Sequence, residues 1–128
     1  MLADVHRPQA EERWTEMALA VATSFRRAAL AHPAAVRLFL TRPASASSAA
    51  RWLEVVQVLR RAGFSSDEAR RVFRAVSRFV VGWCLAEIVE LGDGGDDRRR
   101  AQGDGDFSFG LSALVEALAD RIPGDRSG

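Results

Sequence analysis

The stretch FSSDEARRVFRAVSRFVVGWCL, Phe64 to Leu85, decides the fold class of this chain. Ser65 and Glu68 have the spacing of a capping box, in which each side chain accepts a hydrogen bond from the other residue's backbone N–H. Asp67 adds negative charge to the first turn, where the helix dipole favours it. We therefore predict a helix that begins here and runs to about Leu91, roughly 40 Å at 1.5 Å per residue.

The two halves of this long helix differ in composition. Up to Arg78, apolar residues stand opposite a row of arginines, which is typical of an amphipathic helix. From Phe79 onward, FVVGWCL is apolar all round, so it must be covered on more than one side. In a domain of 128 residues, we expect a second copy of the chain to provide that cover.

Apolar residues at helical spacing predict further helices on both sides of the long one. One is expected within 11–31, and another ends near Gly63, which suits a left-handed C-cap. No segment shows the alternation typical of a strand, so the predicted fold is an all-α helical bundle. The apolar face of the last helix consists of Phe107, Leu111, Leu114, Val115, Leu118 and Ile122.

One domain is predicted over 11–122, after a short connecting segment, 1–10, and before a tail, 123–128. Inside this domain, GDGGDDRRRAQGDGD, 92–106, is rich in glycine and charge and has nothing to bury. We expect 92–106 to be a flexible linker.

Composition excludes several classes of protein. The net charge is +1 and the arginines are spread along the chain, unlike the concentrated charge of a nucleic-acid-binding face. No apolar run approaches the ~20 residues of a membrane-spanning helix. The single cysteine, Cys84, rules out an internal disulfide, which suits a cytoplasmic protein.

Residues for catalysis or metal binding are scarce. The only histidines, His6 and His32, lie outside any metal-binding motif. Cys84 lies in an apolar helix and is expected to be a buried, inert thiol. Glu87 and Glu90 are expected at the exposed edge of the long helix. We therefore predict no enzyme activity, no metal and no cofactor.

Three patterns leave alternatives open. HPAAVRLFLTRP, His32 to Pro43, has a bend before each proline and forms either a corner between helices or the wall of a pocket. A row of three arginines is either a solvated face or a lining that recognises an anionic or polar ligand. Two glycines in apolar helices are either tolerated at a cost in helix propensity or mark close helix–helix contacts, and we expect contacts. The arginines are Arg70, Arg74 and Arg78, and the glycines are Gly82 and Gly110.

Four segments, in this order, resemble the C-terminal effector-binding and dimerisation domain of the tetracycline-repressor (TetR) family of transcriptional regulators. The resemblance spans about Trp14 to Ile122. The segments are SFRRAALAHP (24–33), LTRP (40–43), AGFSSDEARRVFRAVSRFVVG (62–82) and FSFGLSALVEAL (107–118).

The resemblance implies an effector pocket, with the Thr-Arg-Pro turn as part of its wall. The residues that it assigns to ligand binding are Val21, Phe25, Thr41, Arg42, Pro43, Val55, Arg70, Phe73, Arg74 and Ser77. Three positions depart from the tetracycline repressors: Val21 replaces an asparagine, Val55 a glutamine, and Leu38 the histidine that helps bind magnesium. We therefore predict a pocket that uses no metal and does not prefer tetracycline.

The resemblance also implies a homodimer, in which the long helix and the last helix pair with their symmetry mates in a four-helix bundle. The implied interface residues are Phe79, Val80, Gly82, Trp83, Phe107, Gly110, Leu111, Leu114 and Leu118.

In that family a helix-turn-helix module precedes this domain, and too few residues precede the first helix here to form one. We expect a ligand-sensing domain of a repressor that contacts DNA only through an N-terminal domain not present in this chain. The alternative is a stand-alone small-molecule-binding or dimerisation module without a role at DNA.

Overall fold

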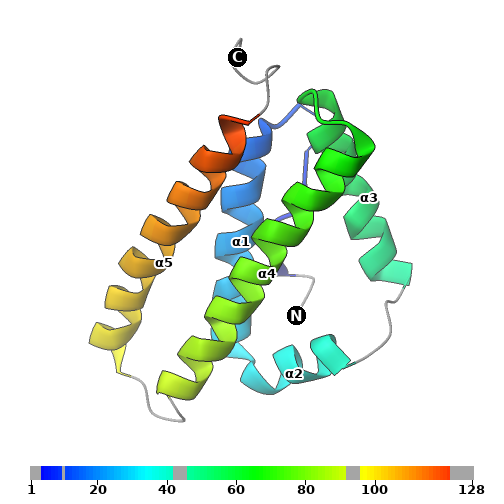
Figure 1. The fold of residues 1–128 in the computed structure, drawn as a ribbon. Helices are drawn as coiled ribbons and strands as arrows, with labels where there is room; N and C mark the ends of the chain where they lie inside the picture. Colours follow the sequence, from blue (N-terminus) through cyan, green and yellow to red (C-terminus); the bar gives the residue numbers. More distant parts are fainter. Residues whose placement is uncertain (1–3, 10, 42–45, 92–95, 122–128) are drawn as a thin grey trace.

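The structure is a computed structural model that describes residues 4–9, 11–41, 46–91 and 96–121. This described part contains five α-helices and no strand, so the predicted all-α fold is confirmed (Figure 1). No helix in it is long and apolar enough to cross a membrane. The helices are α1 (Trp14–Ala31), α2 (Pro33–Thr41), α3 (Ala46–Arg61), α4 (Ser66–Leu91) and α5 (Asp97–Ala119).

Helices α1, α4 and α5 pack against one another and enclose most of the core. Helix α3 packs against α4 on the side away from α5, and α2 crosses the lower end of the bundle (Figure 1). Among the largest fully buried side chains are Phe107 and Leu111 of α5, Cys84 of α4 and Leu59 of α3.

The turn from α3 to α4 has the geometry that the sequence predicts. Gly63 has φ 111°, the left-handed conformation that only glycine adopts without strain. The Ser65 N–H donates to Glu68 Oε1 at 2.9 Å, and the Glu68 N–H donates to Ser65 Oγ at 3.2 Å. The capping box and the glycine C-cap are therefore confirmed.

The first of the two proline-framed breaks is a corner between helices. The His32 N–H donates to the Ala28 carbonyl at 3.0 Å and ends α1, and Pro33 is the first residue of α2. Proline fits this position because the first turn of a helix leaves its N–H groups without intrahelical partners. The second break, at Arg42 and Pro43, lies outside the described residues.

The predicted linker at 92–106 is wrong over 97–106, because these residues form the first turns of α5. Asp96 caps the helix, with its Oδ1 accepting from the Arg99 N–H at 2.8 Å. Further along, Asp104 forms an ion pair with Arg26 of α1. The cap and this contact outweigh the low helix propensity of the glycines. Residues 92–95 lie outside the described residues.

A buried ion pair joins α1 to α4. Arg26 Nε donates to Glu87 Oε1 at 2.6 Å, and its Nη2 donates to Glu87 Oε2 at 2.8 Å. The expectation that Glu87 lies at an exposed edge is therefore wrong, since this residue is only 8% exposed. Its apolar neighbours in sequence gave no sign of a cation on another helix. Hydrogen bonds to Glu87 raise the pKa of Arg26, although burial alone would lower it.

Candidate ligand-binding cavity

A cavity of about 650 Å³ lies between α1, α3, α4 and the N-terminal segment, residues 4–9. Ligand pockets in proteins usually measure about 300–1,000 Å³. Helix α1 contributes Met17, Val21 and Phe25, and its neighbours in the wall are Val55 of α3 and Val76 of α4. The lining is therefore dominated by apolar side chains.

The α3–α4 side of the cavity has an aromatic pair. The rings of Trp52 and Phe73 lie 4.3 Å apart between centroids and are inclined at 62°. Tilted pairs of this kind are favoured because a ring edge then meets the negative face of its partner. Both residues line the cavity, so a ligand there would contact aromatic surface.

The N-terminal segment closes another side of the cavity, with Val5, His6 and Pro8 in the lining. The His6 backbone N–H donates to Ser24 Oγ of α1 at 2.7 Å. Its imidazole Nε2 lies 2.8 Å from Glu12 Oε1. Burial alone would raise the pKa of Glu12, but hydrogen bonds from His6 and from the Gln9 N–H lower it.

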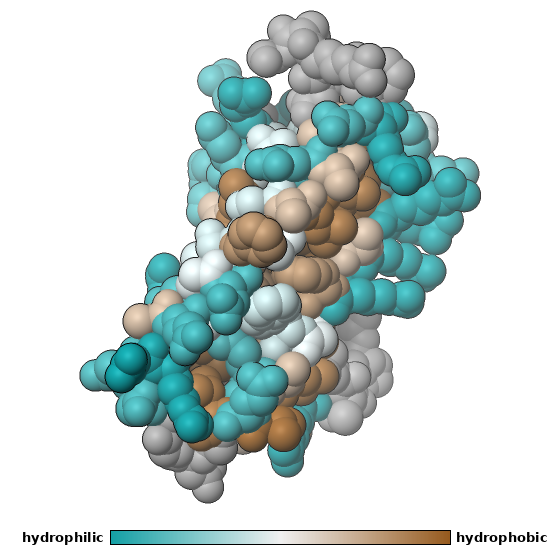
Figure 2. All heavy atoms as spheres, turned by 60° about the vertical axis from the view of Figure 1, so that its left-hand side comes forward, coloured by the Kyte–Doolittle hydropathy of each residue, from teal (hydrophilic) through white to brown (hydrophobic). Residues whose placement is uncertain are grey.

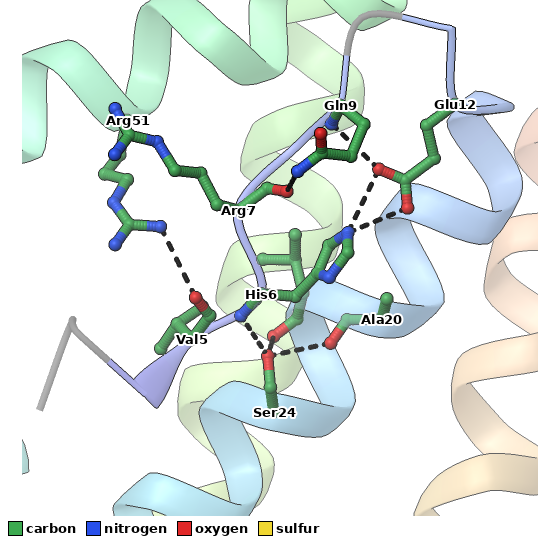
Figure 3. Close-up of polar contacts among 9 residues, drawn as sticks. Val5, His6, Arg7, Gln9, Glu12, Ala20, Ser24 and Arg51 are labelled. Atoms are coloured by element: carbon green, nitrogen blue, oxygen red, sulfur yellow. Dashed lines mark hydrogen bonds and ion pairs between the residues drawn. The ribbon is translucent and has the colours of Figure 1, made fainter.

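The same segment is attached to α3. Arg7 Nη2 donates to Glu54 Oε1 at 2.7 Å, and this hydrogen bond lowers the pKa of Glu54. Arg51 Nη1 donates to the Val5 carbonyl at 3.4 Å (Figure 3). The segment therefore bridges α1 and α3 across the cavity. The sequence analysis missed this bridge, because no periodic pattern marks an extended segment.

The ligand-binding residues predicted from the sequence fall into three groups. Val21, Phe25, Val55, Phe73 and Ser77 line the cavity. Arg70 and Arg74 are exposed on α4 and do not line it. Thr41 is the last residue of α2, and Arg42 and Pro43 lie outside the described residues.

Of the three arginines in the predicted row, only Arg78 lines the cavity. The face that α4 turns to the cavity carries Val72, Phe73, Val76 and Val80, and Arg74 is exposed beside it. A guanidinium without a carboxylate partner is costly to bury, which keeps Arg70 and Arg74 in solvent. Of the two alternatives, a solvated face or a cavity lining, the structure shows the solvated face for Arg70 and Arg74.

Sequence reasoning missed Trp14, Met17 and Trp52 as cavity residues. Their helical spacing identified them as apolar-face residues, but the same spacing is expected in a filled core. Trp14 is 2% exposed, and its Nε1 has no hydrogen-bond partner among the described residues.

The predicted interface residues include some that are buried within the single chain and others that are partly exposed. Val80, Phe107 and Leu111 are buried within the single chain, because α5 packs back onto α1 and α4. In the single chain these side chains have little exposed surface, and their place in a dimer interface stays a prediction. The residues that remain partly exposed on α4 and α5 are Phe79, Trp83, Gly110, Leu114 and Leu118.

The two glycines of the apolar helices differ. A methyl group at Gly110 would lie 3.1 Å from Phe79 Cζ, so glycine allows α5 to approach the α4 side chains. At Gly82, a methyl group would meet no described heavy atom within 4 Å, and this glycine borders the cavity. The predicted close contact is confirmed at Gly110, whereas at Gly82 the described part of the chain provides none.

The outer face of α4 and α5 exposes large apolar side chains. Phe109 of α5 is 81% exposed and Val89 of α4 is 76% exposed. Figure 2, which brings the α5 side forward, shows apolar side chains in a band between hydrophilic ones. Extended apolar surface of this kind often marks an interaction site.

A sequence model of the family described as "Tetracyclin repressor-like, C-terminal domain" matches residues 7–104. The chain belongs to this family. No curated protein and no solved structure matches it at a significant level. The matched range contains every described cavity residue except Val5 and His6.

Tetracyclin repressor-like C-terminal domains are regulatory rather than catalytic, and they typically bind small-molecule effectors and dimerise. Within the described part of this domain, no three His, Cys, Asp or Glu side chains gather as a metal site would need. Leu38, at the position implied for the magnesium ligand, is 51% exposed and lies outside the cavity lining. Metal-independent ligand binding stays a prediction.

Proposed function

We propose that this domain binds a small organic effector with a largely apolar body in the α1–α3–α4 cavity and, as a homodimer, controls DNA binding by a cytoplasmic transcriptional repressor. The observation that supports this most directly is the cavity, whose volume and apolar lining suit a small organic molecule. The residues proposed to contact the effector are Val21, Phe25, Val55, Phe73 and Ser77, with Thr41, Arg42 and Pro43 as predicted further contacts.

The proposed mechanism is a difference in effector affinity between two arrangements of the dimer. The cavity wall includes the N-terminal segment, which lies against Ser24 of α1 and Glu54 of α3. An effector that moves α1 and α3 apart would change the contacts of this segment with Ser24 and with Glu54. The segment would then transmit occupancy of the cavity to a DNA-binding module connected to it.

Binding can be tested with the neutral fluorophore N-phenyl-1-naphthylamine, whose emission rises in apolar sites. We expect saturable binding to the purified domain and much weaker binding to Val55→Trp, which places a bulky indole in the cavity wall. Leu53→Trp is the matched control, because Leu53 is on the same helix but is 59% exposed and does not line the cavity. Equal binding by both variants would place the probe elsewhere and refute the proposal.

For the dimer, we propose that the outer face of α4 and α5, with Phe109 and Val89, packs against a second copy of the chain. Sedimentation equilibrium should give twice the 14.0 kDa mass of one chain. Phe109→Glu should shift the mass to that of a monomer, since it places a charge in an apolar interface. Ser108→Glu, a neighbouring exposed position, should leave the dimer intact. A monomeric wild-type chain at micromolar concentration would contradict the assembly.

A further inference from the structure

The ionisable side chains that line the cavity carry only positive charge or none. They are His6, Arg51 and Arg78, and no Asp or Glu is among the described lining residues. Arg78 is exposed at the cavity border and Arg51 is half-buried. The apolar lining therefore has a cationic border without a carboxylate in it.

Two carboxylates contact the N-terminal segment, and both have hydrogen-bond partners there, although Glu54 Oε2 is buried with no hydrogen-bond partner among the described residues. Glu12 accepts from the His6 imidazole at 2.8 Å and from the Gln9 N–H at 3.0 Å. Glu54 Oε1 accepts hydrogen bonds from Nε and Nη2 of Arg7, at 3.1 and 2.7 Å. Arg51 is close enough to help lower the pKa of Glu54, but less than Arg7 does. Neither acid is among the described lining residues, so the permanently charged side chains in the cavity wall are Arg51 and Arg78.

The two arginines lie on α3 and α4, in the wall of the same cavity. Arg51 of α3 and Arg78 of α4 stand at comparable distances from Gly63, roughly 20 Å along each helix at 1.5 Å per residue. Near the turn from α3 to α4, the cavity lining is apolar and includes Leu59 and Val72. A ligand in the cavity would therefore have its body among apolar side chains, and a polar head group would meet a guanidinium where it reaches Arg51 or Arg78.

From this arrangement we infer that the effector is an amphipathic organic anion, with an apolar body and one carboxylate or comparable head group near Arg78 and Arg51. The inference rests on the proposed function, because it specifies what the same cavity binds. Guanidinium groups suit this task, since their planar donors match a carboxylate and they lose hydration more readily than an ammonium group. A neutral ligand of the same shape would gain less from the guanidinium groups, because its hydrogen bonds with them carry no charge on the acceptor.

The test is displacement of N-phenyl-1-naphthylamine by three ligands of one length: decanoate, 1-decanol and decylammonium. We expect decanoate to compete about fivefold better than decanol, as for a partly solvated charge-assisted contact, and decylammonium to be the weakest. A second pair, 2-naphthoate and 2-naphthol, repeats the comparison with an aromatic body. Preference for the acid in either pair supports the inference. The pair that competes at the lower concentration shows whether the apolar body of the effector is aliphatic or aromatic.

Arg78→Gln and Arg51→Gln should each reduce decanoate competition severalfold and leave decanol unchanged. Arg74→Gln is the matched control, because Arg74 lies one turn from Arg78 on α4, is exposed and does not line the cavity. Circular dichroism of each variant checks that it is folded. Unchanged decanoate binding in folded Arg78→Gln would overturn the inference.

The two proposals fail differently. If the fluorophore binds and each acid competes no better than its neutral counterpart, the anion preference is wrong and the proposed cavity function stands. If the fluorophore binds neither the wild-type domain nor any control variant, the proposed function fails and the anion inference fails with it.

Discussion

The Glu87 carboxylate on α4 receives two parallel hydrogen bonds from the Arg26 guanidinium on α1, at 2.6 and 2.8 Å. Both side chains are almost fully buried, with 10% and 6% of their surfaces exposed. The third nitrogen of Arg26 reaches Asp104 of α5, and its guanidinium carbon lies 5.4 Å from the Phe107 ring centroid. One arginine therefore connects the three helices that enclose most of the core.

Glu87→Gln should lower the free energy of unfolding by about 3 kcal/mol, because it leaves the buried Arg26 charge without its main partner. Urea unfolding followed by circular dichroism, at one fixed protein concentration, measures the change. Glu90→Gln, on the same helix but exposed, should stay within about 0.5 kcal/mol of wild type. Similar losses in the two variants would mean that the ion pair contributes little.

Two glycines of α5 should respond to alanine in opposite directions. A methyl group at Gly103 would lie 2.6 Å from Glu87 Oε2 and 2.9 Å from Arg26 Nη2, so Gly103→Ala must displace the ion pair. We expect it to destabilise the domain by about 1–3 kcal/mol, the usual range for overpacking. At Gly105 a methyl group would meet no described heavy atom within 4 Å, and Gly105→Ala should stabilise by up to about 1 kcal/mol through helix propensity. Thermal unfolding of the pair gives both signs in one experiment.

Cys84 should be almost unreactive in the folded domain. Its side chain is fully buried, and burial raises the pKa of the thiol to about 11, with the nearby Glu87 acting in the same direction. Since only the thiolate reacts, alkylation by iodoacetamide at pH 8 should be slow in buffer and fast in urea. Mass spectrometry of the labelled protein measures both rates. Equal labelling rates would show that α4 opens readily around Cys84.

Acid should loosen the N-terminal segment. The folded pKa of Glu12 lies below its ordinary value of 4.5, so its contribution is fully present above pH 4.5 and is lost as the pH falls through the lower folded value. Hydrogen exchange of the His6 and Gln9 amides should therefore increase, relative to α1, as the pH drops below 4.5. In Glu12→Gln this pH dependence should disappear. A wild-type segment that stays protected at pH 3 would contradict this role for Glu12.

Tetracycline is not expected to bind in a magnesium-dependent way. The resemblance to the tetracycline repressors assigns polar contacts to two positions where this chain has Val21 and Val55, and both line the cavity. The position of the magnesium ligand is Leu38. Calorimetric titration with tetracycline, with and without Mg²⁺, should give the same weak or absent heat. A magnesium-dependent signal would refute the prediction.

Local signals explain most of what the sequence predicted correctly. The capping box of Ser65 and Glu68 and the left-handed Gly63 each depend on neighbouring residues, so they are readable from the chain alone. Val21, Phe25 and Phe73 were assigned to the pocket because the family resemblance placed them there, and the structure puts all three in the cavity lining.

Contacts between distant residues explain most of what was missed. Arg26 and Glu87 are separated by 61 positions, and neither the charge-rich segment around Asp104 nor the apolar half of α4 indicates that they meet. The same holds for Arg7 and Glu54, whose pairing depends on the path of an extended segment. Helical periodicity identifies an apolar face but does not distinguish a filled core from a cavity, so Trp14 and Trp52 could not be assigned from it.

The uneven attachment of the helices has a mechanical consequence. Helices α1, α4 and α5 are braced by Arg26, whereas α3 packs mainly against α4 and is tied to the N-terminal segment by Arg7 and Arg51 at its surface. Helices α1, α4 and α5 should therefore behave as a rigid unit, and α3 should be the helix that moves most easily. Thermal fluctuations, or a ligand larger than the cavity, would displace α3 before they change the packing of α1, α4 and α5.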